Sequence, residues 1–138
     1  MPSSHIDGTP GSGLMTVLVG VTGVLTVGCL LMAVSHAGLR VPLIAGLGPA
    51  GGAAVPPAAA GFGVVTVAYA VVLGGLLRRR PWAWALGLVV YGVTLAGAAM
   101  PFRGAGSAVG IALSALALAL LVSPSVRRAL LPARGAVA

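Results

Sequence analysis

Four long stretches without a charged side chain constrain the fold of this chain more than any other feature. They occupy residues 14–37, 58–77, 82–100 and 105–122. A helix needs about 20 mostly apolar residues to cross the hydrocarbon core of a bilayer, and each stretch is close to that length. The sequence therefore predicts an all-α integral membrane protein in which residues 14–122 form a four-helix transmembrane bundle.

Two alternatives to this architecture fit the sequence less well. Charged residues make up 7% of the chain, whereas about a quarter of a soluble domain is charged, and soluble helices have a polar face that these stretches lack. The first stretch is too long for the apolar region of a signal peptide, and no Lys or Arg precedes it. We expect residues 1–13 to be a flexible cytoplasmic tail and residues 123–138 a basic cytoplasmic tail.

The arginines predict the orientation of the bundle. With four crossings, the segment between the second and third stretches and the segment after the fourth lie on the same side. These two segments contain six arginines: Arg78, Arg79, Arg80, Arg127, Arg128 and Arg134. The other side has Arg40 and Arg103. Because positively charged loops are retained in the cytoplasm, both termini are predicted to be cytoplasmic.

The same arginines, together with two tryptophans, predict an anchor at the inner leaflet of the membrane. Its members are Arg78, Arg79, Arg80, Trp82, Trp84, Arg127 and Arg128. Tryptophan favours the headgroup level, and arginine is attracted to anionic lipids. The net charge of +7 does not indicate nucleic-acid binding, since the arginines lie at the ends of apolar stretches rather than on a polar face. We therefore expect membrane lipids as partners and no nucleic acid.

Two connecting segments have features of their own. Residues 38–57 form a long but apolar outer loop rich in Gly and Pro. The loop either lies on the outer interface or re-enters the bundle; we favour the interface, since a small bundle shelters little irregular backbone. After the fourth stretch, Ser123 and Pro124 resemble a capped helix start that would place Val126 and Leu130 on one face.

Small residues at four-residue spacing predict where helices pack. The clearest row is Gly106, Gly110 and Ser114, and such rows let helix backbones approach closely in lipid. A chain with 22 glycines also produces such rows by chance. The row is therefore as consistent with a chance arrangement as with a real contact between helices.

Four hydroxyl side chains lie at matching depths on the second and third stretches. They are Thr66, Tyr69, Tyr91 and Thr94. The short arginine segment makes these stretches antiparallel neighbours, so the four hydroxyls could meet near the bilayer centre. A hydroxyl in lipid requires a hydrogen-bond partner. We favour a packing clasp between the helices; the alternative is a small polar site for a lipid or another amphiphile.

His36 and Arg40 lie four residues apart at the outer end of the first stretch. On a continued helix they would share a face and could bind a lipid phosphate. More often, such residues only mark the membrane interface, and we favour that interpretation.

The chain lacks the residues that several chemistries require. Its only acidic side chain is Asp7, Cys29 is its only cysteine, and it has two histidines. No charged residue lies within a stretch, although ion-coupled transport usually needs one. Hydrolytic sites and metal clusters cannot be assembled from this set either. We expect no enzyme activity, no metal and no cofactor.

Two segments suggest a family. RRRPWAWALG at residues 78–87 and SPSVRRAL at residues 123–130, in a chain rich in Ala, Gly, Val and Arg without lysine, resemble small, functionally uncharacterised four-span membrane proteins of actinobacterial type. The resemblance covers the spans and implies a multi-pass protein of the plasma membrane. It carries over no functional residue.

Two functions remain as alternatives. The favoured one is a non-enzymatic scaffold or accessory component that packs against itself or a larger membrane protein. The other is a protein that binds or transports a lipid or small amphiphile through the four hydroxyls. A cavity lined by those hydroxyls would favour binding, and direct bonds between them would favour a scaffold.

Overall fold

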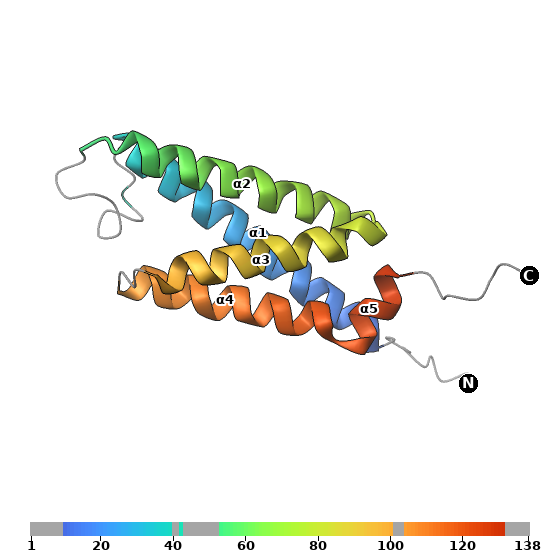
Figure 1. The fold of residues 1–138 in the computed structure, drawn as a ribbon. Helices are drawn as coiled ribbons and strands as arrows, with labels where there is room; N and C mark the ends of the chain where they lie inside the picture. The colour runs from blue at the N-terminus through green and yellow to red at the C-terminus, as the bar shows by residue number, and fades with distance from the viewer. Residues whose placement is uncertain (1–9, 40–41, 43–52, 101–103, 132–138) are drawn as a thin grey trace, which may run out of the picture.

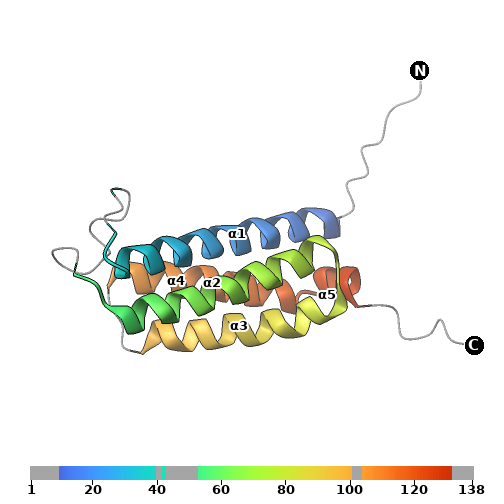
Figure 2. The same ribbon diagram turned by 90° about the horizontal axis from the view of Figure 1, so that it is seen from above.

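The computed structural model describes residues 10–39, 42, 53–100 and 104–131, and this part of the chain is all-helical. Five helices follow one another: α1 (Pro10–His36), α2 (Pro56–Leu77), α3 (Pro81–Ala99), α4 (Ala105–Val122) and α5 (Pro124–Leu130). The first four run alternately up and down as one bundle, and α1 begins near α5 (Figure 1). Seen from above, α1 and α3 lie on opposite sides of the bundle (Figure 2). The predicted all-α architecture is confirmed for the described residues.

Proline marks the helix starts. Four of the five helices begin at a proline: Pro10, Pro56, Pro81 and Pro124. Proline is tolerated in the first turn, where its missing N–H would have had no partner inside the helix. Consequently α1 and α2 begin a few residues before the predicted stretches, which start at residues 14 and 58.

Among the described residues, three helices are long and apolar enough to cross a membrane, namely α1, α2 and α3. Helix α4 is different, since it meets the same criteria only together with α5, as a pair bent by 69°. The break lies at Ser123, which caps α5 by accepting a hydrogen bond from the Val126 N–H at 3.4 Å. The structure therefore has three candidate spans, or four when the bent pair counts as one.

Helix α5 folds back across one end of the bundle. Val126 and Leu130 are both buried, while Arg127 and Arg128 are exposed. The buried face contacts α1, α3 and α4. This is the predicted short helix with an apolar face, and it closes the end of the bundle where α1 begins.

The bundle packs as two helix pairs, α1 with α2 and α3 with α4. Its largest fully buried apolar side chains are Tyr69, Tyr91, Leu18, Leu76, Leu121, Val72 and Val126. Many valines point outward instead: Val17, Val24, Val27, Val64, Val67, Val71, Val89 and Val93. An apolar exterior of this kind suits a lipid surrounding, because water would not solvate it.

Helices α1 and α2 end with the same backbone motif but with different residues. In α2, the Arg79 N–H donates to the Leu76 carbonyl at 3.0 Å, and the Arg80 N–H donates to the Gly75 carbonyl at 2.9 Å. This Schellman pattern requires a left-handed residue, which is Arg79 with φ of 49°. In α1 the corresponding residue is Gly38, with φ of 93°. Arg79 thus occupies a conformation that normally favours glycine.

We expect Arg79→Gly to stabilise the bundle. Glycine adopts the left-handed conformation without a steric penalty, so the free energy of unfolding should rise by about 1 kcal/mol. Thermal unfolding in detergent would show a higher midpoint. Arg78→Gly is the control, since Arg78 has φ of −89° and gains no such relief. A lower midpoint for Arg79→Gly than for the unmodified chain would contradict the prediction.

Candidate functional site

The hydroxyl cluster joins three helices. The Tyr69 hydroxyl of α2 lies 2.7 Å from the Thr94 Oγ1 of α3. The Tyr91 hydroxyl of α3 lies 2.5 Å from the Thr22 Oγ1 of α1. The two tyrosine rings are tilted by 44°, with their centroids 5.4 Å apart. Both tyrosines are buried, so the cluster forms the polar centre of an otherwise apolar interior.

The direction of these hydrogen bonds follows from the threonines. Thr22 Oγ1 donates to the Leu18 carbonyl at 2.7 Å, and Thr94 Oγ1 donates to the Val90 carbonyl at 2.8 Å. A threonine hydroxyl has one hydrogen, so each tyrosine must be the donor in its pair. Among the described residues, no buried side-chain nitrogen or oxygen lacks a hydrogen-bond partner. The cluster is a satisfied network that ties helix to helix.

Two of the predicted hydroxyls therefore meet directly across α2 and α3, and the other two do not. Thr66 donates to the Phe62 carbonyl of its own helix at 2.8 Å. Thr22 of α1 bonds Tyr91 instead, and the sequence analysis had not singled it out. One feature of the sequence points to Thr22: it lies near the middle of the first stretch. Its distance from the start of α1 is similar to the distance of Tyr91 from the start of α3. Without a short loop between α1 and its neighbours, that match could not be recognised from the sequence.

The predicted row of small residues on α4 divides along its length. Ser114 is buried and lies within reach of the Tyr69 hydroxyl. A Cβ at Gly110 would lie 3.8 Å from the Ala98 Cβ of α3. Gly106 is exposed. The inner part of the row thus faces the interior of the same chain.

At the predicted outer end, His36 connects α1 to α2. Its Nδ1 lies 2.8 Å from the Met32 carbonyl and must carry the hydrogen, since a carbonyl only accepts. Its ring packs against Phe62 with centroids 5.1 Å apart. The His36 carbonyl accepts a hydrogen bond from the Val55 N–H at 2.7 Å. Arg40 lies outside the described residues, so the structure does not show the predicted pair.

The two tryptophans of the predicted inner anchor have different surroundings. Trp84 is half-buried, and its Nε1–H donates to the Leu121 carbonyl of α4 at 3.0 Å. The Arg127 guanidinium carbon lies 5.8 Å from the Trp84 ring centroid, which is a cation–π distance. Trp82 is 48% exposed. Trp84 therefore connects α3 to the bend between α4 and α5, while Trp82 stays at the surface.

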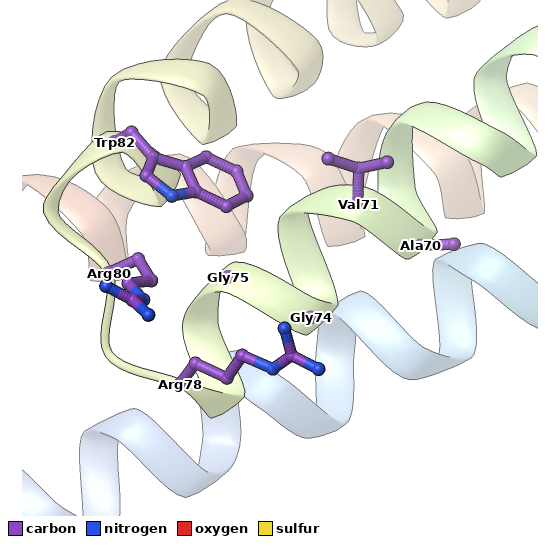
Figure 3. Close-up of a pocket in the computed structure, with 7 residues that line it drawn as sticks. All are labelled: Ala70, Val71, Gly74, Gly75, Arg78, Arg80 and Trp82. Carbon is purple, nitrogen blue, oxygen red and sulfur yellow. The ribbon is translucent and has the colours of Figure 1, made fainter.

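A cavity of about 430 Å³ lies beside the turn from α2 to α3. It is lined by Ala70, Val71, Gly74, Gly75, Arg78, Arg80 and Trp82. None of these residues belongs to the hydroxyl cluster (Figure 3). Its arginines and Trp82 belong to the predicted inner-leaflet anchor, but the sequence pattern does not predict a cavity between them.

Comparison with protein-family models, with curated proteins and with solved structures found no match for this chain. The resemblance to four-span actinobacterial proteins therefore stays a prediction. Function has to be inferred from the geometry of the chain itself.

Proposed function

We propose that this chain is a multi-pass protein of the plasma membrane, with both termini in the cytoplasm. It acts as a non-enzymatic scaffold or accessory component, packing against a second copy or a larger membrane protein. The apolar exterior and the three or four helices of spanning length support the membrane location. The arginine distribution supports the orientation.

The observation that carries the scaffold role is the direct bonding within the hydroxyl cluster. Tyr69 bonds Thr94, and Tyr91 bonds Thr22, at 2.7 and 2.5 Å. A guest that used these hydroxyls would have to break bonds that hold α1, α2 and α3 together. Interhelical hydrogen bonds in membranes contribute on the order of 1 kcal/mol each, and they fix the relative positions of helices. The cluster therefore supports a firmly packed component rather than a carrier.

Helix α1 offers the surface for lateral packing. Gly20 and Gly28 are exposed and share a face with Val24. A Cβ at either glycine would meet nothing within 4 Å. An outward face with so little side-chain volume lets a neighbouring helix approach closely, as small residues do in membrane interfaces.

A bulky side chain on this face should weaken assembly. We expect the double variant Gly20→Leu and Gly28→Leu to lose most of the protein captured with a tagged chain from its native membrane in mild detergent. Captured proteins and lipids would be identified and counted by mass spectrometry. Gly97→Leu is the control and should retain the captured protein, because Gly97 is also exposed and open but lies on α3.

Two outcomes would contradict the proposal. One is capture of the chain alone, without a stoichiometric partner or second copy. The other is capture of one enriched lipid without protein, lost when Tyr69 and Tyr91 are replaced by phenylalanine. That second result would identify the hydroxyl cluster as a lipid site.

A further inference from the structure

The cavity beside the turn from α2 to α3 combines an apolar floor with two positive charges. Ala70, Val71 and Gly74 belong to the floor; Arg80 lies at the turn, and the Arg78 side chain extends along α2 with its guanidinium beside Gly74 (Figure 3). The Trp82 indole ring lies over the opposite side from Arg78 (Figure 3). The volume of the cavity, about 430 Å³, falls within the usual range for small-ligand sites, about 300–1,000 Å³.

Two neighbouring glycines create this space. A Cβ at Gly74 would meet nothing within 4 Å, so the floor is open there. A Cβ at Gly75 would lie 2.7 Å from the Trp82 ring, so the missing side chain lets the indole approach α2. The missing side chain of Gly74 therefore leaves space in the cavity, and that of Gly75 allows the Trp82 ring to form one wall of it.

The backbone of the turn selects which arginines reach the cavity. Arg79 takes the left-handed conformation and does not line it, whereas Arg78 and Arg80 on either side do. Figure 3 shows both guanidinium groups extending on the same side of the turn. The only acidic side chain of the chain, Asp7, lies outside the described residues. Within the described part, no carboxylate side chain neutralises the two guanidinium groups.

An apolar track leads away from these charges along α2. Val64, Val67 and Val71 are 71%, 63% and 46% exposed. Together with Gly74 and Arg78, they follow three- and four-residue spacing and so lie on one face of the helix. The track begins at the charged end and runs toward the bilayer centre, as an acyl chain does below its headgroup.

We propose that this cavity binds one anionic phospholipid of the cytoplasmic leaflet. Its phosphate lies between Arg78 and Arg80, its glycerol region packs against Trp82, and an acyl chain follows the valine track. Guanidinium groups bind phosphate through charge-assisted hydrogen bonds, and two positive charges favour a headgroup with a net negative charge over one whose phosphate is balanced by its own cation. The inference rests on the proposed membrane location and orientation, which place this turn at the inner leaflet.

The test is a binding titration of the detergent-solubilised full-length chain. Native mass spectrometry would count bound dioleoyl phosphatidylglycerol against dioleoyl phosphatidylcholine. We expect the double variant Arg78→Gln and Arg80→Gln to bind phosphatidylglycerol about 30-fold more weakly, given the contribution of each arginine near an anionic lipid. The double variant Arg127→Gln and Arg128→Gln removes the same charge from the same end of the bundle and should retain binding.

A second variant separates shape from charge. Gly74→Leu fills the cavity without a backbone clash and keeps both arginines. It should lose phosphatidylglycerol binding while its thermal midpoint stays close to that of the unmodified chain. Inorganic phosphate at millimolar concentration should not displace the lipid, because the acyl track contributes to binding.

Three outcomes would overturn the site. They are equal loss of binding in both arginine double variants, unchanged binding in Gly74→Leu, and displacement of the lipid by inorganic phosphate. The last outcome would indicate a phosphate site rather than a lipid site. Failure of the membrane proposal is recognised separately, since the chain would then be absent from carbonate-washed membranes. A membrane-embedded chain without lipid preference would refute only the site.

Discussion

Replacing Tyr91 with alanine should destabilise the bundle by about 3–5 kcal/mol, the usual effect of truncating a buried aromatic side chain. Tyr91 is 0% exposed and contacts two other helices, through Thr22 of α1 and the ring of Tyr69 of α2. The truncation would leave a cavity and remove the bond to α1. Unfolding in mixed detergent and sodium dodecyl sulfate, followed by circular dichroism, measures the change.

The variant Tyr91→Phe separates packing from hydrogen bonding at the same position. It keeps the ring and removes only the hydroxyl, so the loss should be about 1 kcal/mol, as for other interhelical bonds in membranes. Thr22→Val should cost a similar amount, and the double variant should cost less than the sum, because both changes remove one bond. If the losses of the two single variants add up to the loss of the double variant, the hydrogen bond between the two hydroxyls does not contribute to stability.

The variant Gly75→Leu should strongly destabilise the bundle, with about 3 kcal/mol of lost stability. A Cβ there would lie 2.7 Å from both the Ala83 Cβ and the Trp82 ring. Trp82 can turn away into its exposed surroundings, but the Ala83 Cβ is fixed to the backbone of α3. Helices α2 and α3 would therefore have to separate at their shared turn. Thermal unfolding in detergent would show a sharply lower midpoint.

The neighbouring glycine provides the control. Gly74→Leu introduces the same side chain one residue earlier, where nothing lies within 4 Å, and leucine favours a helix more than glycine does. Its unfolding midpoint should be unchanged or slightly higher. Equal destabilisation by both variants would show that leucine is harmful at this end of α2 for a reason other than the contact with Ala83.

The sequence predicted the helices because their signals are local. Apolar stretches of spanning length located α1 to α4, and Ser123 with Pro124 located α5. The closeness of Tyr69 and Tyr91 could also be predicted, because the short turn between α2 and α3 places them at nearly equal depth, and their ring centroids lie 5.4 Å apart. The bond from Tyr69 to Thr94 does not follow from equal depth, since Thr94 lies farther from the turn. The cytoplasmic position of the termini depends on a membrane and stays a prediction.

The sequence could not predict contacts that depend on helix packing. Thr22 reaches Tyr91 across the middle of the bundle, and the connection after α1 is too long to set that register. The cavity depends on the close approach of Trp82 to Gly75, which no spacing rule reveals. The left-handed Arg79 was equally hidden, since three consecutive arginines give no sign of which one replaces a glycine.

The unequal lengths of α1 and α4 affect the thickness of the bilayer next to each helix. With 27 residues, α1 is about 40 Å long, while α4 has 18 residues and is about 27 Å long. A hydrocarbon core of about 30 Å cannot match both when both stand upright. Helix α1 would tilt to fit, and the lipids around α4 would compress their chains. The protein would then be surrounded by an uneven annulus, thinner beside α4 than beside α1.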